Sequence, residues 1–270
     1  MVSTDKPSGL PGLKAALEVR DFHKCGALYN TLLDDSEQPP IADKHIANLA
    51  EIFVRNDAEK VFGIHLIHGH FKIPQGTVIL GTNFKDPSLR WARVTSIDKV
   101  DPLRVHGHIF ALTKDGLCAY ELQDGPLPDL SGVRPQFLDS FINYLVKNDL
   151  TSVIGLQVLG CSNCSMSELI LDQGTVMLDS SCVKNPVLSR ITGWKFEEVG
   201  GIPRACKPKE LHLKNVDGAH QVYRRGEPIP KLENIDDLKA ALSEAGVIYL
   251  LEDWIWLFLL FQHFLAFVNC

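Results

Sequence analysis

The chain has 270 residues, enough to bury a sizeable core, and its 45% hydrophobic and 22% charged residues exclude a disordered protein. A formal net charge of −6 at pH 7, without a run rich in Lys and Arg, argues against nucleic acid as a partner. The N-terminal stretch lacks the cationic start and apolar block of a secretory signal, so we expect a cytoplasmic protein whose seven cysteines are mainly free thiols.

The first sixty residues favour helices. In residues 41–57, the apolar side chains of Ile46, Leu49 and Phe53 recur at a spacing that places them on one helical face. A segment before residue 30 shows the same pattern more weakly, and Gly26 interrupts it. The sequence therefore predicts a helical N-terminal portion.

Short β-rich runs follow from Val61 onward, separated by turns that contain Pro, Gly and Asp. The runs are VFGIHLIHGHF, GTVILGTNF, LRWARVTSI, RVHGHIFALT and LCAYEL. Their length and β-branched content predict strands, and their close succession favours an antiparallel meander.

The second half of the chain mixes one clear helix with further strands. An apolar stripe in residues 134–150 predicts a helix, and a second helix is expected over Ile235–Gly246, with acidic residues at its start and Gly246 at its end. Strand-like runs lie between them: SVIGLQVL, ELILDQGTVMLDSS, WKFEEV, KELHLKNV and AHQVYRR. We expect a single α+β domain over residues 1–246, with an antiparallel β-sheet core, a helical N-terminal portion and a few packed helices.

Residues 247–270 form an atypical apolar C-terminal tail. A helix over Trp254–Val268 would span about 22 Å, less than the roughly 30 Å of a bilayer core, and an upstream extension brings in Glu252 and Asp253. A buried terminal helix or an exposed apolar peptide is therefore favoured over a membrane anchor. A mistaken reading frame at the end of the gene is a further alternative.

Two predicted strands each carry a His-Gly-His motif, and these histidines are the main candidate site. His68 and His70 in HLIHGHF share one strand face with Phe62, Ile64 and Leu66, and His65 points to the other face. In VHGHIF, the same alternation places His106 and His108 with Phe110 and Leu112. Gly69 and Gly107 leave space for a ligand or another backbone on the opposite face.

If the two strands pair in register, the imidazoles of His68, His70, His106 and His108 converge and could bind a divalent transition metal such as Zn or Fe. His65 could then support these ligands, provided the strand twists enough to bring it round. Structural histidines, each hydrogen-bonded within the fold, are the alternative. A cupin-type barrel also supplies His-x-His, but it expects a Glu a few residues later, which HGHFKIPQG does not provide.

Cys161 and Cys164 form a second, weaker candidate. They follow a predicted strand and precede Ser165-Met-Ser-Glu168, whose Ser-x-x-Glu spacing could form a helix capping box. This order fits a thioredoxin-type redox site, and the two thiols could also bind zinc. The strand-like run directly after them favours a loop with two inert thiols.

No phosphate-binding loop, dinucleotide fingerprint or hydrolase nucleophile elbow occurs in the sequence. The stretches HLIHGHFKIPQGTVILGTNF, VHGHIFALT, GPLPDL and MSELILDQGTVMLDSS resemble a group of ascomycete fungal proteins that have no assigned activity, over roughly residues 44–246. The resemblance implies a cytosolic fungal protein in the context of specialised metabolism.

From these observations we expect a protein that binds a small molecule, or a metal-dependent enzyme, with the histidine cluster at its centre. A non-catalytic interaction or scaffold protein with structural histidines is the first alternative. A protein attached to a membrane through its tail is the second.

Overall fold

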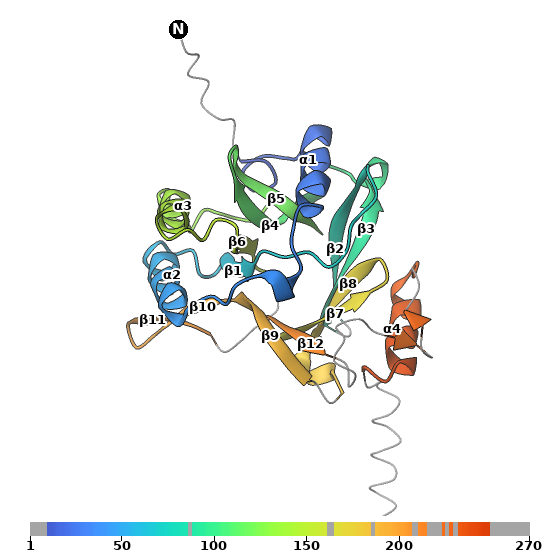
Figure 1. The fold of residues 1–270 in the computed structure, drawn as a ribbon. Helices are drawn as coiled ribbons and strands as arrows, with labels where there is room; N and C mark the ends of the chain where they lie inside the picture. The colour runs from blue at the N-terminus through green and yellow to red at the C-terminus, as the bar shows by residue number, and fades with distance from the viewer. Residues whose placement is uncertain are drawn as a thin grey trace, which may run out of the picture.

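The fold is a β-barrel with helices packed on its outside (Figure 1). In the computed structural model, the described residues are 10–85, 88–160, 165–184, 187–206, 210–214, 223–224, 227–228 and 232–248.

The strands of the barrel are hydrogen-bonded in a closed ring. Around the ring their order is β1 (Phe62–Leu66), β6 (Ile154–Val158), β4 (Val105–Thr113), β5 (Gly116–Asp124), β2 (Thr77–Lys85), β3 (Ser88–Ser96), β8 (Gly174–Asp179), β7 (Met166–Leu171), β12 (Glu210–Lys214) and β9 (Val187–Trp194). Pairing of β9 with β1 closes the ring. Because the ring is closed, these strands have no exposed edge that could pair with another chain.

The barrel is a mixed sheet, so the predicted antiparallel core is only partly right. Successive strands form antiparallel hairpins in β2–β3, β4–β5 and β7–β8, as the meander predicts. However, β2 pairs with β5 and β7 pairs with β12 in parallel. These long-range pairings depend on how the ring closes, and the alternation within each strand carries no information about them.

Four described α-helices flank the barrel: α1 (Val19–Tyr29), α2 (Asp43–Arg55), α3 (Phe137–Lys147) and α4 (Ile235–Glu244). The predicted helices over 41–57, 134–150 and 235–246 are confirmed. The weak pattern before residue 30 also forms a helix, and Gly26 is tolerated there because α1 approaches β2 closely. A Cβ on Gly26 would lie 2.4 Å from the Thr77 carbonyl oxygen.

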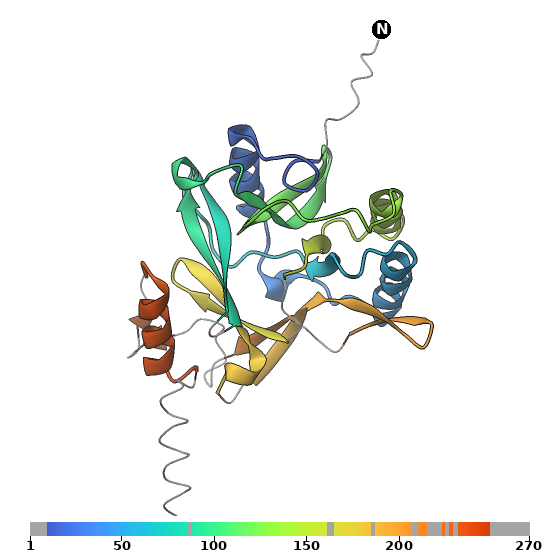
Figure 2. The ribbon, with the colours of Figure 1, turned by 180° about the vertical axis from the view of Figure 1, so that it is seen from behind.

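Two short hairpins complete the described structure. The first joins β10 (Phe196–Val199) to β11 (Ile202–Ala205) and packs against α2. The second joins β13 (Tyr223–Arg224) to β14 (Glu227–Pro228). Figures 1 and 2 show α2 and α3 together on one flank of the barrel and α4 on the opposite flank.

Apolar side chains fill the space between the helices and the barrel. Under α2 and α3, the ring of Phe53 packs against Phe137, Phe141 and Phe196, with centroids 4.9, 5.8 and 4.7 Å away. A separate cluster holds α4 on the outer face of β3, β7 and β8. Because the outer faces of the strands supply most of this core, the barrel interior is free to carry polar groups.

The apolar tail from residue 249 onward lies outside the described residues, as does the predicted anchor over Trp254–Val268. Within the described ranges, no helix combines the length and apolarity needed to cross a bilayer.

Candidate metal centre and the adjoining pocket

His68 and His70 lie beyond the end of β1, and this changes the side on which they point. The strand stops at Leu66, so its two-residue alternation does not continue into the following loop. The rings of His65 and His68 consequently stack, with centroids 5.1 Å apart, although the sequence pattern places them on opposite faces. The expectation that His65 points away from His68 is therefore wrong.

A shift of register in β4 similarly redirects the second histidine pair. The β4–β5 pairing shifts on both sides of Ile109, next to His108, which reverses the alternation of the residues that follow. Phe110 and Leu112 therefore join the core beneath the helices, while His106 and His108 line a pocket. The expectation that His106 and His108 share a strand face with Phe110 and Leu112 is therefore wrong.

The two predicted strands are also not neighbours, because β6 lies between β1 and β4. The structure brings His68 and His70 together with Glu168 of β7, and the three offer ligand atoms that all lie within 4.8 Å of one another. His106 and His108 are not members of this group.

The distances within the group of His68, His70 and Glu168 suit a metal ion. Glu168 Oε1 lies 3.4 Å from His70 Nε2, and its Oε2 lies 3.9 Å from His68 Nε2. Ligand atoms around a tetrahedral ion with bonds of about 2.1 Å are separated by about 3.4 Å. All three side chains are at least nine-tenths buried, which is unusual for a carboxylate.

A backbone hydrogen bond determines which nitrogen of the neutral His68 ring carries the hydrogen. His68 Nδ1 lies 2.7 Å from the Leu66 carbonyl oxygen, which can only accept, so Nδ1 carries the hydrogen. In the neutral ring, Nε2 then presents a lone pair towards the Glu168 carboxylate. A metal ion or a proton between these two electron-rich groups would relieve their repulsion.

The loop that carries His68 and His70 is held firmly by the segment after α1. The Asn30 side chain donates to the Ile73 carbonyl oxygen and accepts from the Ile73 amide, at 2.9 and 2.8 Å. The Gly69 amide donates to the Leu33 carbonyl oxygen at 2.8 Å. Hydrogen bonds on both sides of the two histidines restrict their movement, which favours a pre-organised site.

Next to this group, an arginine is buried inside the barrel with a glutamate and a glutamine. Arg90 Nη2 lies 3.0 Å from Glu121 Oε2, and Arg90 Nε donates to Gln123 Oε1 at 2.8 Å. Gly81 makes room for the guanidinium group, because a Cβ at that position would lie 2.5 Å from both Nε and Nη2 of Arg90.

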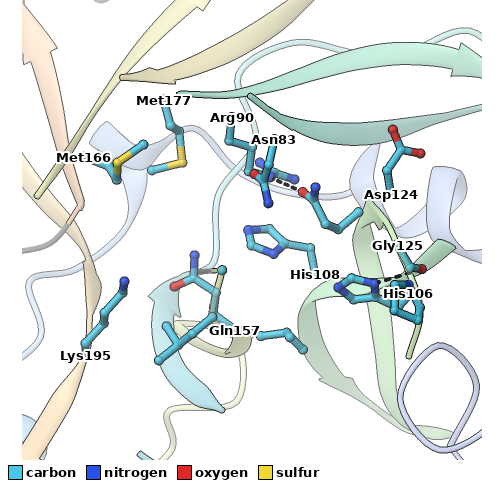
Figure 3. A pocket seen from close by; sticks show the side chains of 15 residues that line it. Asn83, Arg90, His106, His108, Asp124, Gly125, Gln157, Met166, Met177 and Lys195 are labelled. Carbon is cyan, nitrogen blue, oxygen red and sulfur yellow. Dashed lines mark hydrogen bonds between the residues drawn. The ribbon is translucent and has the colours of Figure 1, made fainter. Parts of the chain in front are cut away.

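Arg90 and Gln123 line a pocket of about 230 Å³, together with His106 and His108 (Figure 3). Met177 of β8 lines it and pairs directly with both Glu168 and Arg90 in the neighbouring strands. In Figure 3, the ring of His108 projects into the pocket between Arg90 and Gln157. Arg90, Met177 and Glu168 therefore lie side by side on one face of β3, β8 and β7, so Glu168 is separated from the pocket by one strand position.

Burial controls the ionisation of this interior. Desolvation lowers the pKa of His108 well below its usual value, and the charge of Arg90 lowers it further, so His108 is neutral at pH 7. His106 and His65 act in the same direction, and Glu168 opposes them. Desolvation also raises the pKa of Glu121, against the effect of Arg90.

The shifted pKa of His108 predicts a pH dependence of stability. Its folded-state pKa lies below the unfolded value of about 6.5, so acidification below pH 6.5 protonates the unfolded state first and lowers the free energy of unfolding. Glu121, with its raised pKa, acts in the opposite direction. Comparing wild type with His108→Gln separates the two effects, because Glu121 is present in both proteins. Between pH 7.5 and 5.5, the free energy of unfolding should fall more in metal-free wild type than in His108→Gln.

Urea unfolding of both proteins at the two pH values measures this difference. An equal loss in wild type and His108→Gln would contradict a buried, neutral His108.

The close contact at Gly81 predicts a destabilising substitution. Gly81→Ala should lower the free energy of unfolding by about 1–3 kcal/mol, because the new methyl group displaces the Arg90 guanidinium. Gly132→Ala is the matched control, since a Cβ at Gly132 meets open space. We expect the control to stay within about 1 kcal/mol of the parent in chemical denaturation. Equal effects of the two substitutions would contradict the packing of Arg90 over Gly81.

The sequence analysis did not identify Glu168 as a candidate metal ligand. Ser165-Met-Ser-Glu168 suggested a helix capping box, but Met166–Leu171 is strand β7, and Glu168 is buried inside it. An acidic residue within an apolar β run was the available signal.

The cysteine candidates carry less weight. Cys161 and Cys164 lie outside the described residues. The described cysteines are free thiols, as expected, and burial raises the pKa of Cys25 well above its usual value, which makes that thiol unreactive.

Fold and site together define a mixed β-barrel with a buried His/His/Glu group and a small pocket lined by polar residues of the neighbouring strands. Comparison of the chain with protein-family models, curated proteins and solved structures gave no match. The resemblance to ascomycete proteins therefore stays a prediction.

Proposed function

We propose that this chain is a metal-dependent enzyme that acts on a small molecule. A divalent transition metal, Zn²⁺ or Fe²⁺, is held inside the barrel by His68, His70 and Glu168. The observation that carries the proposal is the buried carboxylate of Glu168 facing two imidazole nitrogens at 3.4 and 3.9 Å.

The donor set supports a reactive centre more than a structural one. Two imidazoles and one carboxylate leave positions for water and substrate, whereas structural zinc sites are closed by four protein ligands. The hydrogen bond from His68 to the Leu66 carbonyl oxygen orients the ring in the way that metal-binding histidines commonly require.

The surrounding residues supply a suitable environment for catalysis. A bound ion supplies Lewis acidity or an activated water. The chain's own groups bind and orient the substrate in the pocket, and the apolar side chains of Met166 and Met177 exclude water from it. His108, neutral and aimed into the pocket, is placed to hold or move a proton at its Nε2 atom.

Elemental analysis of the full chain tests the proposal. Protein stripped with a chelator, loaded with Zn²⁺ or anaerobically with Fe²⁺ and then desalted should retain about one ion per chain. His68→Ala should lose it. His106→Ala is the matched control and should keep it, because His106 is not a member of the His/His/Glu group.

Retention well below one ion per chain, unchanged in His68→Ala, would overturn the proposal. That result would instead support the alternative of a non-catalytic protein in which Glu168 pairs with a protonated histidine.

A further inference from the structure

The pocket beside the His/Glu group contains buried nitrogen atoms that no described residue engages. Gln123 and His108 are 4% and 5% exposed, and among the described residues neither Gln123 Nε2 nor His108 Nε2 has a hydrogen-bond partner. Leaving a buried polar atom unpaired costs about 1–3 kcal/mol, so a ligand is expected to satisfy these atoms.

The orientation of the Gln123 amide is determined by its neighbour. Arg90 can only donate hydrogen bonds, so the atom of Gln123 that faces Arg90 Nε at 2.8 Å must be the oxygen. The other end of the amide is then the NH₂ group. The pocket therefore contains a buried donor whose identity does not depend on a choice of rotamer.

Arg90 adds a charged donor to the same pocket. Its Nε and Nη2 atoms bond to Gln123, Glu121 and the Leu122 carbonyl oxygen, while Nη1 makes no hydrogen bond to any described residue. Arg90, His108 and Gln123 all line the pocket. In the tautomer with its hydrogen on Nε2, His108 is a further donor, so three donors from three different strands surround one space.

The volume of the pocket limits the size of the ligand. A cavity of about 150 Å³ accepts benzene, so about 230 Å³ accommodates roughly six to nine non-hydrogen atoms. Glu121 balances the charge of Arg90, and the lining also contains Asp124, whose carboxylate accepts from the Thr82 hydroxyl. Several buried donors in a space of this size match a planar group with two acceptor oxygens, such as a carboxylate.

We propose that this pocket binds the carboxylate group of a small organic acid, which Gln123 Nε2, Arg90 Nη1 and His108 Nε2 hold beside the His/Glu group. The inference deepens the proposed function by naming the substrate class, and it rests on that function for the role of the acid as substrate. A divalent ion at His68, His70 and Glu168 would add positive charge to the same interior and strengthen the preference for an anion.

Binding of matched acids and amides to the full chain tests the inference. Pyruvate and pyruvamide, and lactate and lactamide, differ in charge but hardly in size. Calorimetric titration into both the chelator-treated and the Zn²⁺-loaded protein should give a Kd at least tenfold lower for each acid than for its amide. Gln123→Glu should raise the Kd of the acids at least tenfold, because it replaces a donor with a negative charge and keeps the acceptor for Arg90.

Gln173→Glu is the matched control, since Gln173 lies in the exposed turn between β7 and β8, and it should leave every Kd unchanged. Equal binding of acids and amides, no binding of the acids to folded protein, or an unaltered Kd in Gln123→Glu would each overturn the inference. Acid binding that requires Zn²⁺ and ignores Gln123→Glu would also overturn it, because the ion alone would then hold the acid. Acid binding in a chain that retains no metal would support the pocket while the proposed metal function fails.

Discussion

Replacing Arg90 with Met is expected to lower the free energy of unfolding by about 3–5 kcal/mol, which is the usual cost of breaking a buried ion pair. Arg90 and Glu121 are 8% and 13% exposed in their side chains and lie 3.0 Å apart. The substitution leaves the Glu121 carboxylate buried without its cation, and it also removes the partner of the Gln123 side-chain oxygen. Denaturant unfolding at pH 8 measures the effect, because burying the unpaired Glu121 carboxylate destabilises the fold most at a pH where carboxylates are ionised.

Two further variants make this result specific. Arg90→Met/Glu121→Met should recover most of the lost stability, because it removes both buried charges and fills a similar volume. Arg134→Met is the surface counterpart: its bond to Asp57 is 2.7 Å long, but both side chains are more than half exposed. It should cost less than about 1 kcal/mol. If Arg90→Met alone lowered the free energy of unfolding as little as Arg134→Met does, the barrel interior would have to be well hydrated.

The second large effect concerns metal affinity. Glu168→Gln should weaken metal binding by at least about 100-fold, the upper range for the loss of a residue that only supports a ligand. The amide keeps the shape of the side chain but removes the negative charge that attracts the ion. Because the change also removes a buried charge, the stability of the metal-free protein should stay close to that of wild type. Competition with a chromophoric chelator measures the affinity, and denaturant unfolding measures the stability.

The control for this charge change is Glu51→Gln, on the exposed face of α2, where Glu51 pairs with Arg55. It should leave metal affinity unchanged. Glu168→Gln with wild-type affinity would mean that the ion is bound elsewhere in the chain.

Local patterns predicted the elements well and their arrangement poorly. Helical periodicity identified α2, α3 and α4 within a few residues, because an amphipathic stripe is a property of the segment alone. The strand runs were also placed close to β2, β3, β4 and β5. The mixed order of the ring was missed, since parallel neighbours such as β2 and β5 are determined by closure of the whole barrel.

The histidine site shows the same limit at the level of side chains. The repeated His-Gly-His correctly directed attention to a buried polar interior, but the assumed two-residue alternation failed for both pairs. The end of β1 at Leu66 turns His68 towards His65, and the register shift in β4 separates His108 from Phe110. Glu168 completes the group from β7, a distant strand, and no spacing rule connects it to His68.

The central claim is that one ion binds to two imidazoles and one carboxylate inside the barrel, and X-ray absorption at the zinc edge of the loaded full chain tests it most directly. The account predicts nitrogen and oxygen ligands at about 2.0–2.2 Å, with the scattering pattern of two imidazole rings both in wild type and in His106→Ala, which keeps all three ligands. Sulfur ligands, or a pattern without two imidazole rings in the loaded wild type, would contradict it.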